Sequence, residues 1–103
     1  MSQEIKDRFK QFVAPTYGRF PITLDRGEGA YVWDTDGKRY LDLGGGIAVN
    51  CLGHSHPEIS QVLAEQSSRL MHCTNFYHFD GQAKLAENLA KRLGQGRVFF
   101  CNS

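Results

Sequence analysis

Apolar residues recur with helical spacing at the start of the chain. Ile5, Phe9 and Phe12 stand at positions i, i+4 and i+7, and Val13 follows at i+8. This spacing places the four side chains on one face of an α-helix. Pro15 should end the helix, because the residue before a proline is pushed out of the helical region. The pattern predicts an amphipathic helix followed by an extended connector.

The pattern changes to that of strands between residues 22 and 43. A first strand is predicted around Ile22 and Leu24 and is followed by a turn at 25–29 (DRGEG). A second strand is predicted at 30–34 (AYVWD). An Asp-Gly turn at 35–38 (TDGK) then leads to a third strand at 38–43 (KRYLDL). We therefore expect an antiparallel β-meander. A meander this small needs a further element to cover one of its faces.

A glycine-rich loop at 44–57 (GGGIAVNCLGHSHP) precedes a second helix. Pro57 suits the first helical turn, and Glu58 lies where the helix dipole favours an acidic residue. The apolar stripe of this helix is formed by Ile59, Val62, Leu63 and Leu70. We expect the helix to continue until the aromatic-rich loop at 72–81 (HCTNFYHFDG).

Small and apolar residues then predict a third helix. Its stripe consists of Ala83, Ala86, Leu89, Ala90 and Leu93, and Gly94 and Gly96 should end it. Residues 97–101 (RVFFC) are apolar and aromatic, which predicts a short buried strand. Such a strand wants neighbours, and an unpaired one would be prone to aggregation. The fold class expected for the chain is α+β. The arrangement of its elements looks incomplete, because the last predicted strand has no predicted neighbour.

Composition narrows the possible functions only a little. The 103 residues are 41% hydrophobic, with a formal charge of +1 and no cluster of Lys and Arg, so neither nucleic acid nor an anionic membrane is an expected partner. No stretch approaches the roughly 20 apolar residues of a membrane span. Three cysteines without an export signal favour reduced thiols and a cytoplasmic location.

Two groups of residues raise the question of a binding site. Cys51, His54 and His56, with His72, Cys73 and His78 downstream, are residue types that bind zinc, although their spacing is not that of a structural zinc site. His54 and His56 could instead make local backbone hydrogen bonds in a loop that enters a helix. Gly44, Gly45 and Gly46 could cradle a phosphate or could serve backbone geometry alone.

The remaining candidates are less specific. The loop aromatics could line a planar ligand or pack an interface; they are Tyr17, Phe76, Tyr77 and Phe79. The five lysines all lie in charged surroundings that look solvated, which does not suit a lysine of depressed pKa; they are Lys6, Lys10, Lys38, Lys84 and Lys91.

Three stretches together resemble the N-terminal part of the class III (ornithine-type) pyridoxal-phosphate-dependent aminotransferases. They are GEGAYVWDTDGKRYLDLGGGIAVNCLGHSHPEI, HCTNFYHFDGQAKLAENLA and RVFFCNS, and the similarity runs from about Phe12 to Ser103. Within the family, the chain looks most similar to the acetylornithine and succinylornithine branch. The resemblance implies a parent of fold type I, with an α/β/α large domain and a small domain, that acts as a homodimer.

The resemblance also implies an activity. Such enzymes transfer the ω-amino group of N-acetylornithine, succinylornithine or ornithine to 2-oxoglutarate in a ping-pong reaction of arginine metabolism. The cofactor is pyridoxal 5′-phosphate, bound by a lysine of the large domain. By the same resemblance, residues 1–93 form an N-terminal, small-domain part, and residues 94–103 are the first strand of the large domain.

Individual residues match family positions. Ser103 begins the turn that binds the cofactor phosphate, where backbone N–H groups and a helix dipole favour an anion. Thr74 and Asn75 match a segment that reaches the partner's cofactor across the dimer. Tyr17, together with Gly46 and Ile47, matches the substrate side.

The chain also departs from the family pattern. The stretch NFYHFDGQ differs from the aromatic pair and Asn-Glu-Pro-Gln that relatives more often show. No residue of the chain matches the catalytic lysine, so the 103 residues alone are expected to be inactive. Two alternatives stay open, namely a non-catalytic dimerisation or binding module and a small metal-binding protein that uses Cys51, His54 and His56.

Overall fold

The computed structural model describes residues 1–102, and the chain divides into two compact units. The first is Met1–Glu65 and the second begins at Gln66, so the division falls within a helix. The predicted domain boundary between residues 93 and 94 concerns the parent enzyme and stays a prediction.

The first helix confirms the spacing of its apolar residues. Helix α1 spans Ser2–Phe12, and Val13 leaves it in an extended conformation, two residues before Pro15. The Ser2 and Thr23 hydroxyls lie 3.0 Å apart, and Lys6 Nζ donates to the Pro21 carbonyl at 3.1 Å. These two contacts connect the helix to the end of the extended connector.

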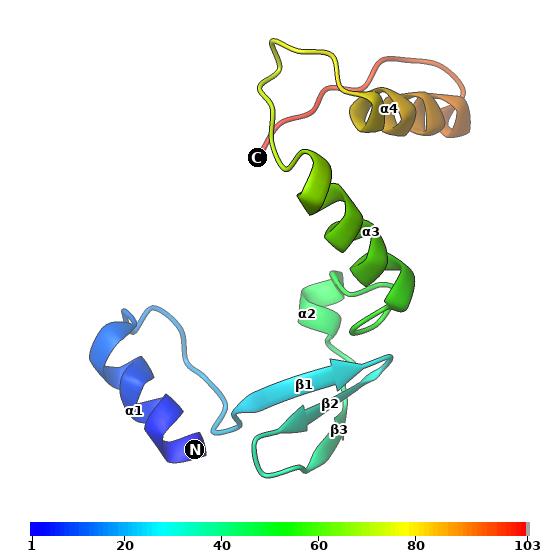
Figure 1. Cartoon of the computed structure of the whole chain (residues 1–103). Helices are drawn as coiled ribbons and strands as arrows, with labels where there is room; N and C mark the ends of the chain where they lie inside the picture. The colour runs from blue at the N-terminus through cyan, green and yellow to red at the C-terminus, as the bar shows by residue number, and fades with distance from the viewer. Residues whose placement is uncertain (103) are drawn as a thin grey trace. The chain divides into compact units, whose positions relative to one another are not determined.

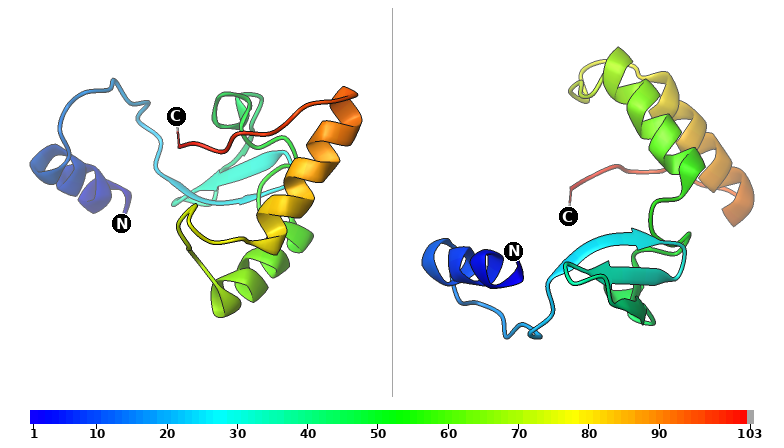
Figure 2. Two further views of the ribbon diagram at one scale, coloured as in Figure 1. Left: turned by 90° about the horizontal axis from the view of Figure 1, so that it is seen from above. Right: turned by 60° about the horizontal axis from the view of Figure 1, so that its bottom comes forward.

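The predicted meander is a three-stranded antiparallel sheet (Figures 1 and 2). Its strands are β1 (Leu24–Glu28), β2 (Tyr31–Asp34) and β3 (Arg39–Leu41). The predicted Asp-Gly turn joins β2 to β3, where Asp34 Oδ1 accepts from the Asp36 and Lys38 amides at 3.0 and 2.9 Å. The predicted turn at 25–29 is wrong, because most of it forms β1 opposite β2 and the chain reverses one residue later, at Gly29 and Ala30.

The two faces of the sheet differ. Val32 is buried, with 8% of its surface exposed, and it is the one buried apolar side chain in the described part of the chain. On the neighbouring strand positions, Arg26 stacks over the Trp33 ring at 3.7 Å and Arg39 over the Tyr31 ring at 4.7 Å. Cation–π stacking of this kind lets charged and aromatic residues share an exposed face.

The two further predicted helices form, although Leu70 of the predicted stripe lies just after the first of them, and a short helical turn corrects the glycine-rich loop. Helix α3 spans Pro57–Arg69 and α4 spans Asp80–Leu93. The loop after β3 contains a short helical turn, α2 (Gly45–Ala48). Helices and an antiparallel sheet in one chain confirm the α+β class. Among residues 1–102, no helix combines the length and apolarity needed to cross a membrane.

The predicted terminal strand is not formed. Residues 97–102 have no strand partner, because the only strands in the described part of the chain pair with one another. The segment returns past α4 (Figure 1), with Val98 and Phe100 half-buried and Phe99 84% exposed. This alternation is that of an extended chain with only one face covered.

Gly27 in β1 lies against the ring of His54. A Cβ added at Gly27 would lie 2.6 Å from His54 Cγ and 2.7 Å from His54 Cβ, which is closer than any van der Waals contact. The Ser55 hydroxyl also donates to the Gly27 carbonyl at 2.8 Å, so the backbone at this point has little room to move. The close approach explains a glycine in the middle of a strand.

We predict that Gly27→Ala destabilises the fold by about 1–3 kcal/mol, the usual cost of overpacking. The matched control is Gly18→Ala, where a Cβ meets nothing within 4 Å and the change should be nearly neutral. Urea unfolding midpoints of the two variants check this. Equal midpoints would show that the His54 ring moves aside freely.

The Tyr40 hydroxyl donates to Asp34 Oδ2 at 2.7 Å, and this bond, with the backbone amides of the turn, holds the pKa of Asp34 below its usual value. A lowered pKa stabilises the fold above the ordinary aspartate range, and the contribution is lost as pH falls through the folded-state pKa. We therefore predict that Tyr40→Phe lowers the melting temperature at pH 7. The difference from the unmodified protein should shrink as the pH approaches 3.

Tyr31→Phe is the control, since it removes a tyrosine hydroxyl from the sheet without touching Asp34. Thermal melts across pH 3–7 make the measurement. A Tyr40→Phe deficit that stays constant over this range would contradict the role of Asp34.

Candidate functional site

The loop after β3 contains a left-handed helical turn. Gly45, Gly46, Ile47 and Ala48 have φ of 50°, 66°, 64° and 59°. The Ile47 and Ala48 amides donate to the Gly44 carbonyl at 2.8 and 3.0 Å, and the Val49 amide to Gly45 at 2.9 Å. Left-handed helical backbone costs an L-residue roughly 1–2 kcal/mol, and a β-branched residue such as Ile47 rarely adopts it. Strain of this kind persists where surrounding contacts enforce it, frequently at functional sites.

The Asp42 carboxylate supplies such contacts. Its Oδ1 accepts from the amides of Gly44 and Gly45 at 3.1 and 2.9 Å, and its Oδ2 lies 2.7 Å from His54 Nε2. The bond with His54 and those from the two amides hold the pKa of Asp42 below its usual value. An ionised carboxylate can only accept hydrogen bonds, so Nε2 of His54 carries the proton between them.

His54 is fixed by its backbone as well as its ring. Its amide and carbonyl form a two-bond bridge with Gly29, at 2.8 and 3.0 Å, and its ring is 24% exposed. Local backbone bonding is one of the alternatives that the sequence leaves open for His54. Its backbone bonds instead reach Gly29, and its side chain reaches a carboxylate twelve residues earlier. Sequence reasoning missed Asp42 altogether. An aspartate two residues before a run of glycines was the available signal, since Asp readily accepts from nearby backbone amides.

The cysteines and histidines do not gather into a metal site in the part of the chain that the structure describes. Within residues 1–102, no three His, Cys, Asp or Glu side chains lie where they could share a metal ion. The Cys51 thiol donates to the Ala48 carbonyl at 3.5 Å, at the end of the left-handed turn. His54 directs its Nε2 at Asp42.

The three residues matched to the substrate side are placed in two locations. Gly46 and Ile47 lie within the left-handed turn, and the Ile47 side chain is 94% exposed. Tyr17 lies in the connector between α1 and β1 and is 75% exposed. Among the described residues, no hydrogen bond joins Tyr17 to the turn.

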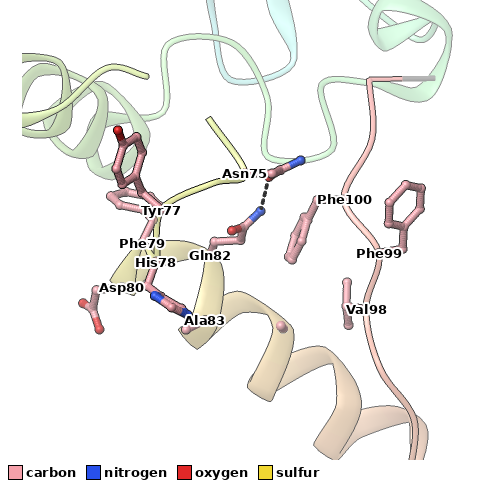
Figure 3. Close-up of a pocket in the computed structure, with 11 residues that line it drawn as sticks. Asn75, Tyr77, His78, Phe79, Asp80, Gln82, Ala83, Val98, Phe99 and Phe100 are labelled. Atoms are coloured by element: carbon pink, nitrogen blue, oxygen red, sulfur yellow. Dashed lines mark hydrogen bonds between the residues drawn. The ribbon is translucent and has the colours of Figure 1, made fainter. Parts of the chain in front are cut away.

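Thr74 and Asn75 lie in the second unit, where a hollow of about 580 Å³ opens between α4 and the segment after it (Figure 3). Asn75 lines the hollow with Phe79, Val98 and Phe100, and its Oδ1 accepts from Gln82 Nε2 at 3.4 Å. Thr74 lines an adjoining hollow of about 170 Å³.

The two side chains leave hydrogen-bond donors available. Thr74 Oγ1 accepts from the Phe76 amide at 3.1 Å, which leaves its hydroxyl hydrogen to donate. Asn75 accepts through Oδ1, which leaves both hydrogens of its Nδ2 to donate. A pair of uncharged donors suits an anionic group such as a phosphate. Ser103, the third residue matched to the cofactor, lies outside the described residues.

Comparisons with known proteins agree on one family. Residues 12–103 match the profile of the family described as Aminotransferase class-III. The chain is 52% identical over 90 residues to an acetylornithine aminotransferase of Methanopyrus kandleri, covering 85% of this chain and 23% of that protein. It is 50% identical over 97 residues to one of Thermosynechococcus vestitus, covering 94% of this chain and 24% of that protein.

Solved structures give the same result. An acetylornithine aminotransferase of Elizabethkingia anophelis matches with a TM-score of 0.88 and 31% identity, over 93% of this chain and 25% of that one. The ornithine δ-aminotransferase of Plasmodium falciparum matches with a TM-score of 0.92 and 26% identity, over 99% of this chain and 27% of that one. The chain thus spans about a quarter of the length of these relatives. Because the family profile covers residues 12–103, this chain belongs to the class III aminotransferases.

Proposed function

We propose that the protein containing this segment transfers the ω-amino group of N-acetylornithine to 2-oxoglutarate, with succinylornithine and ornithine as related donors. The observation that carries this proposal is the identity of 50–52% to proteins named acetylornithine aminotransferase, over 85–94% of this chain. When bound, pyridoxal 5′-phosphate supplies the electron-withdrawing ring that this chemistry requires. The chain contributes contacts rather than the catalytic lysine.

The surroundings of the lysines support the inactivity of residues 1–103 alone. Lys10, Lys84 and Lys91 form ion pairs with side chains 70–78% exposed. Lys6 donates to a backbone carbonyl and Lys38 stacks on Tyr40, both near the surface. A lysine that attacks a carbonyl needs a desolvated pocket that favours its neutral form. None of the five has such a pocket in the described part of the chain.

Each matched residue receives a role in the proposed enzyme. Thr74 and Asn75 donate hydrogen bonds to the cofactor phosphate of the partner in a homodimer, and Ser103 donates to that of its own subunit. Tyr17, Gly46 and Ile47 contact the amino donor. The three cysteines are free, which supports a reducing, cytoplasmic compartment.

A second candidate is a dimerisation or binding module without catalysis of its own. It is favoured by apolar side chains that the chain leaves uncovered, including Phe20 at 87%, Leu43 at 88% and Phe76 at 92% exposure. Exposed large apolar side chains are the material from which interaction surfaces are built. Light scattering on residues 1–103 separates this candidate from the first, because a discrete dimer supports the module and a monomer or disordered aggregate contradicts it.

We predict that the full-length protein forms glutamate from 2-oxoglutarate, with its highest kcat/KM for N-acetylornithine among the three donors. Residues 1–103 alone should form none. A coupled glutamate assay with purified proteins and added pyridoxal phosphate makes the comparison. A higher kcat/KM for ornithine would move the protein to the ornithine branch, and activity of residues 1–103 would refute their inactivity.

We further predict that Asn75→Asp weakens pyridoxal phosphate binding to the full-length apoprotein by about tenfold, equivalent to about 1.4 kcal/mol. The substitution keeps the acceptor for Gln82 but replaces the phosphate donor with a negative charge. The control is Asn88→Asp, the same change at an exposed position of α4, which should leave the affinity within twofold. Cofactor titration by fluorescence gives both constants, and equal values would place Asn75 away from the phosphate.

A further inference from the structure

We propose that Asp42 and His54 are positioning residues that hold the left-handed turn Gly45–Ala48 and thereby place Ile47 against the amino donor. The role of Ile47 in this proposal rests on the proposed function. The holding of the turn rests on geometry within Met1–Glu65 alone.

The turn needs an external support. Four successive residues have positive φ, and two of them, Ile47 and Ala48, carry a Cβ that disfavours this conformation. Gly45 and Gly46 lower the cost of the first half only, since glycine populates positive φ freely. Without further contacts, Ile47 would return to an ordinary conformation and its side chain would change direction.

The Asp42 carboxylate acts at the point where the chain enters the turn. Its Oδ1 accepts hydrogen bonds from both the Gly44 and the Gly45 amide, and Gly45 is the first residue of the turn with positive φ. By contrast, the longer right-handed helices α1 and α4 begin without any side-chain cap. Of these three helix starts, the least favourable one is therefore the one whose first amides are bonded by a carboxylate.

His54 keeps the carboxylate in place. Its ring bonds the second oxygen of Asp42 at 2.7 Å, so the carboxylate cannot rotate away from the glycine amides without breaking that bond. The ring itself is limited by Gly27 on one side and by the bridge to Gly29. The turn is therefore connected to the sheet through the contacts of Asp42 with His54 and of His54 with Gly27 and Gly29.

The conformation of the turn determines the direction of the Ile47 side chain. This side chain is 94% exposed, so packing against the described residues can do little to fix its direction and the backbone of the turn fixes it. An apolar side chain held outward by a rigid turn can contact the methylene chain of a long amino donor. It should contribute less to 2-oxoglutarate, which reacts in the other half of the ping-pong cycle and offers a shorter methylene chain between two carboxylates.

A double-mutant cycle in the full-length enzyme tests this. Asp42→Ala should lower kcat/KM for N-acetylornithine about tenfold and kcat/KM for 2-oxoglutarate less than twofold, and Ile47→Ala should do the same. If Asp42 acts through Ile47, the double variant should be no worse than Ile47→Ala alone. Asp42→Asn keeps an acceptor for the glycine amides through Oδ1, while its Nδ2 can donate to His54 in the other ring tautomer, so it should recover most of the loss.

Two outcomes would overturn the role in placing Ile47. Equal losses in both half-reactions would indicate a lower fraction of folded enzyme, and additive losses in the double variant would separate Asp42 from Ile47. Should Asp42→Ala fail to fold, His54→Phe takes its place, because it keeps a ring against Gly27 and removes only the bond to Asp42. It should show the same split between half-reactions.

Amide hydrogen exchange tests the holding of the turn without any assay of activity. Asp42→Ala should accelerate exchange at residues 44–49 at least tenfold, while Asp42→Asn stays within threefold of the unmodified protein. Unchanged exchange in Asp42→Ala would overturn the proposal. A full-length protein that transaminates no ω-amino donor would refute the proposed function, and the exchange result would still decide whether the pair holds the turn.

Discussion

The left-handed turn of the first unit depends on a single carboxylate that accepts three hydrogen bonds. Asp42 joins the end of β3, the amides that begin the left-handed turn and the His54 ring. Because the backbone of that turn is unfavourable for Ile47 and Ala48, the contacts of Asp42 determine whether it forms. Gly27 also contributes to this arrangement, because its lack of a side chain leaves space for the His54 ring.

Polar contacts are important for holding this turn because the described chain buries so little apolar surface. Val32 alone is buried, while side chains such as Leu43 and Phe76 are about nine-tenths exposed. Burial of such side chains would ordinarily supply the main driving force of folding. In the proposed enzyme, this surface is available to the partner subunit. The same surface also explains why a binding module is the natural second candidate.

The sequence predicted the elements that short-range signals control. The spacing of apolar residues located α1, α3 and α4, and the Asp-Gly pair located the β2–β3 turn. It misjudged β1, whose charged residues look like a turn until Arg26 stacks on Trp33 across the sheet. It also predicted a strand at 97–101, which requires a neighbouring strand that periodicity cannot supply.

As with the fold, only part of the candidate site could be predicted from the sequence. The glycine run stood out in the sequence itself, and Gly46, Ile47, Thr74 and Asn75 were predicted as site residues by similarity to a family. The left-handed turn was not predicted, because isoleucine and alanine rarely adopt that backbone. The bond between Asp42 and His54 was missed because it joins residues that no local pattern connects.

All the contacts that shape the left-handed turn come from a short stretch of chain. They begin at Gly27 and end at Ser55, and none requires the second unit. Contacts so close in sequence form early, because little loop entropy is lost when they close. The backbone of this turn can therefore form while a longer chain is still being synthesised, because it needs no contact from the second unit. A substitution at Gly27, Asp42 or His54 should accordingly alter the turn without disturbing the contacts within the second unit.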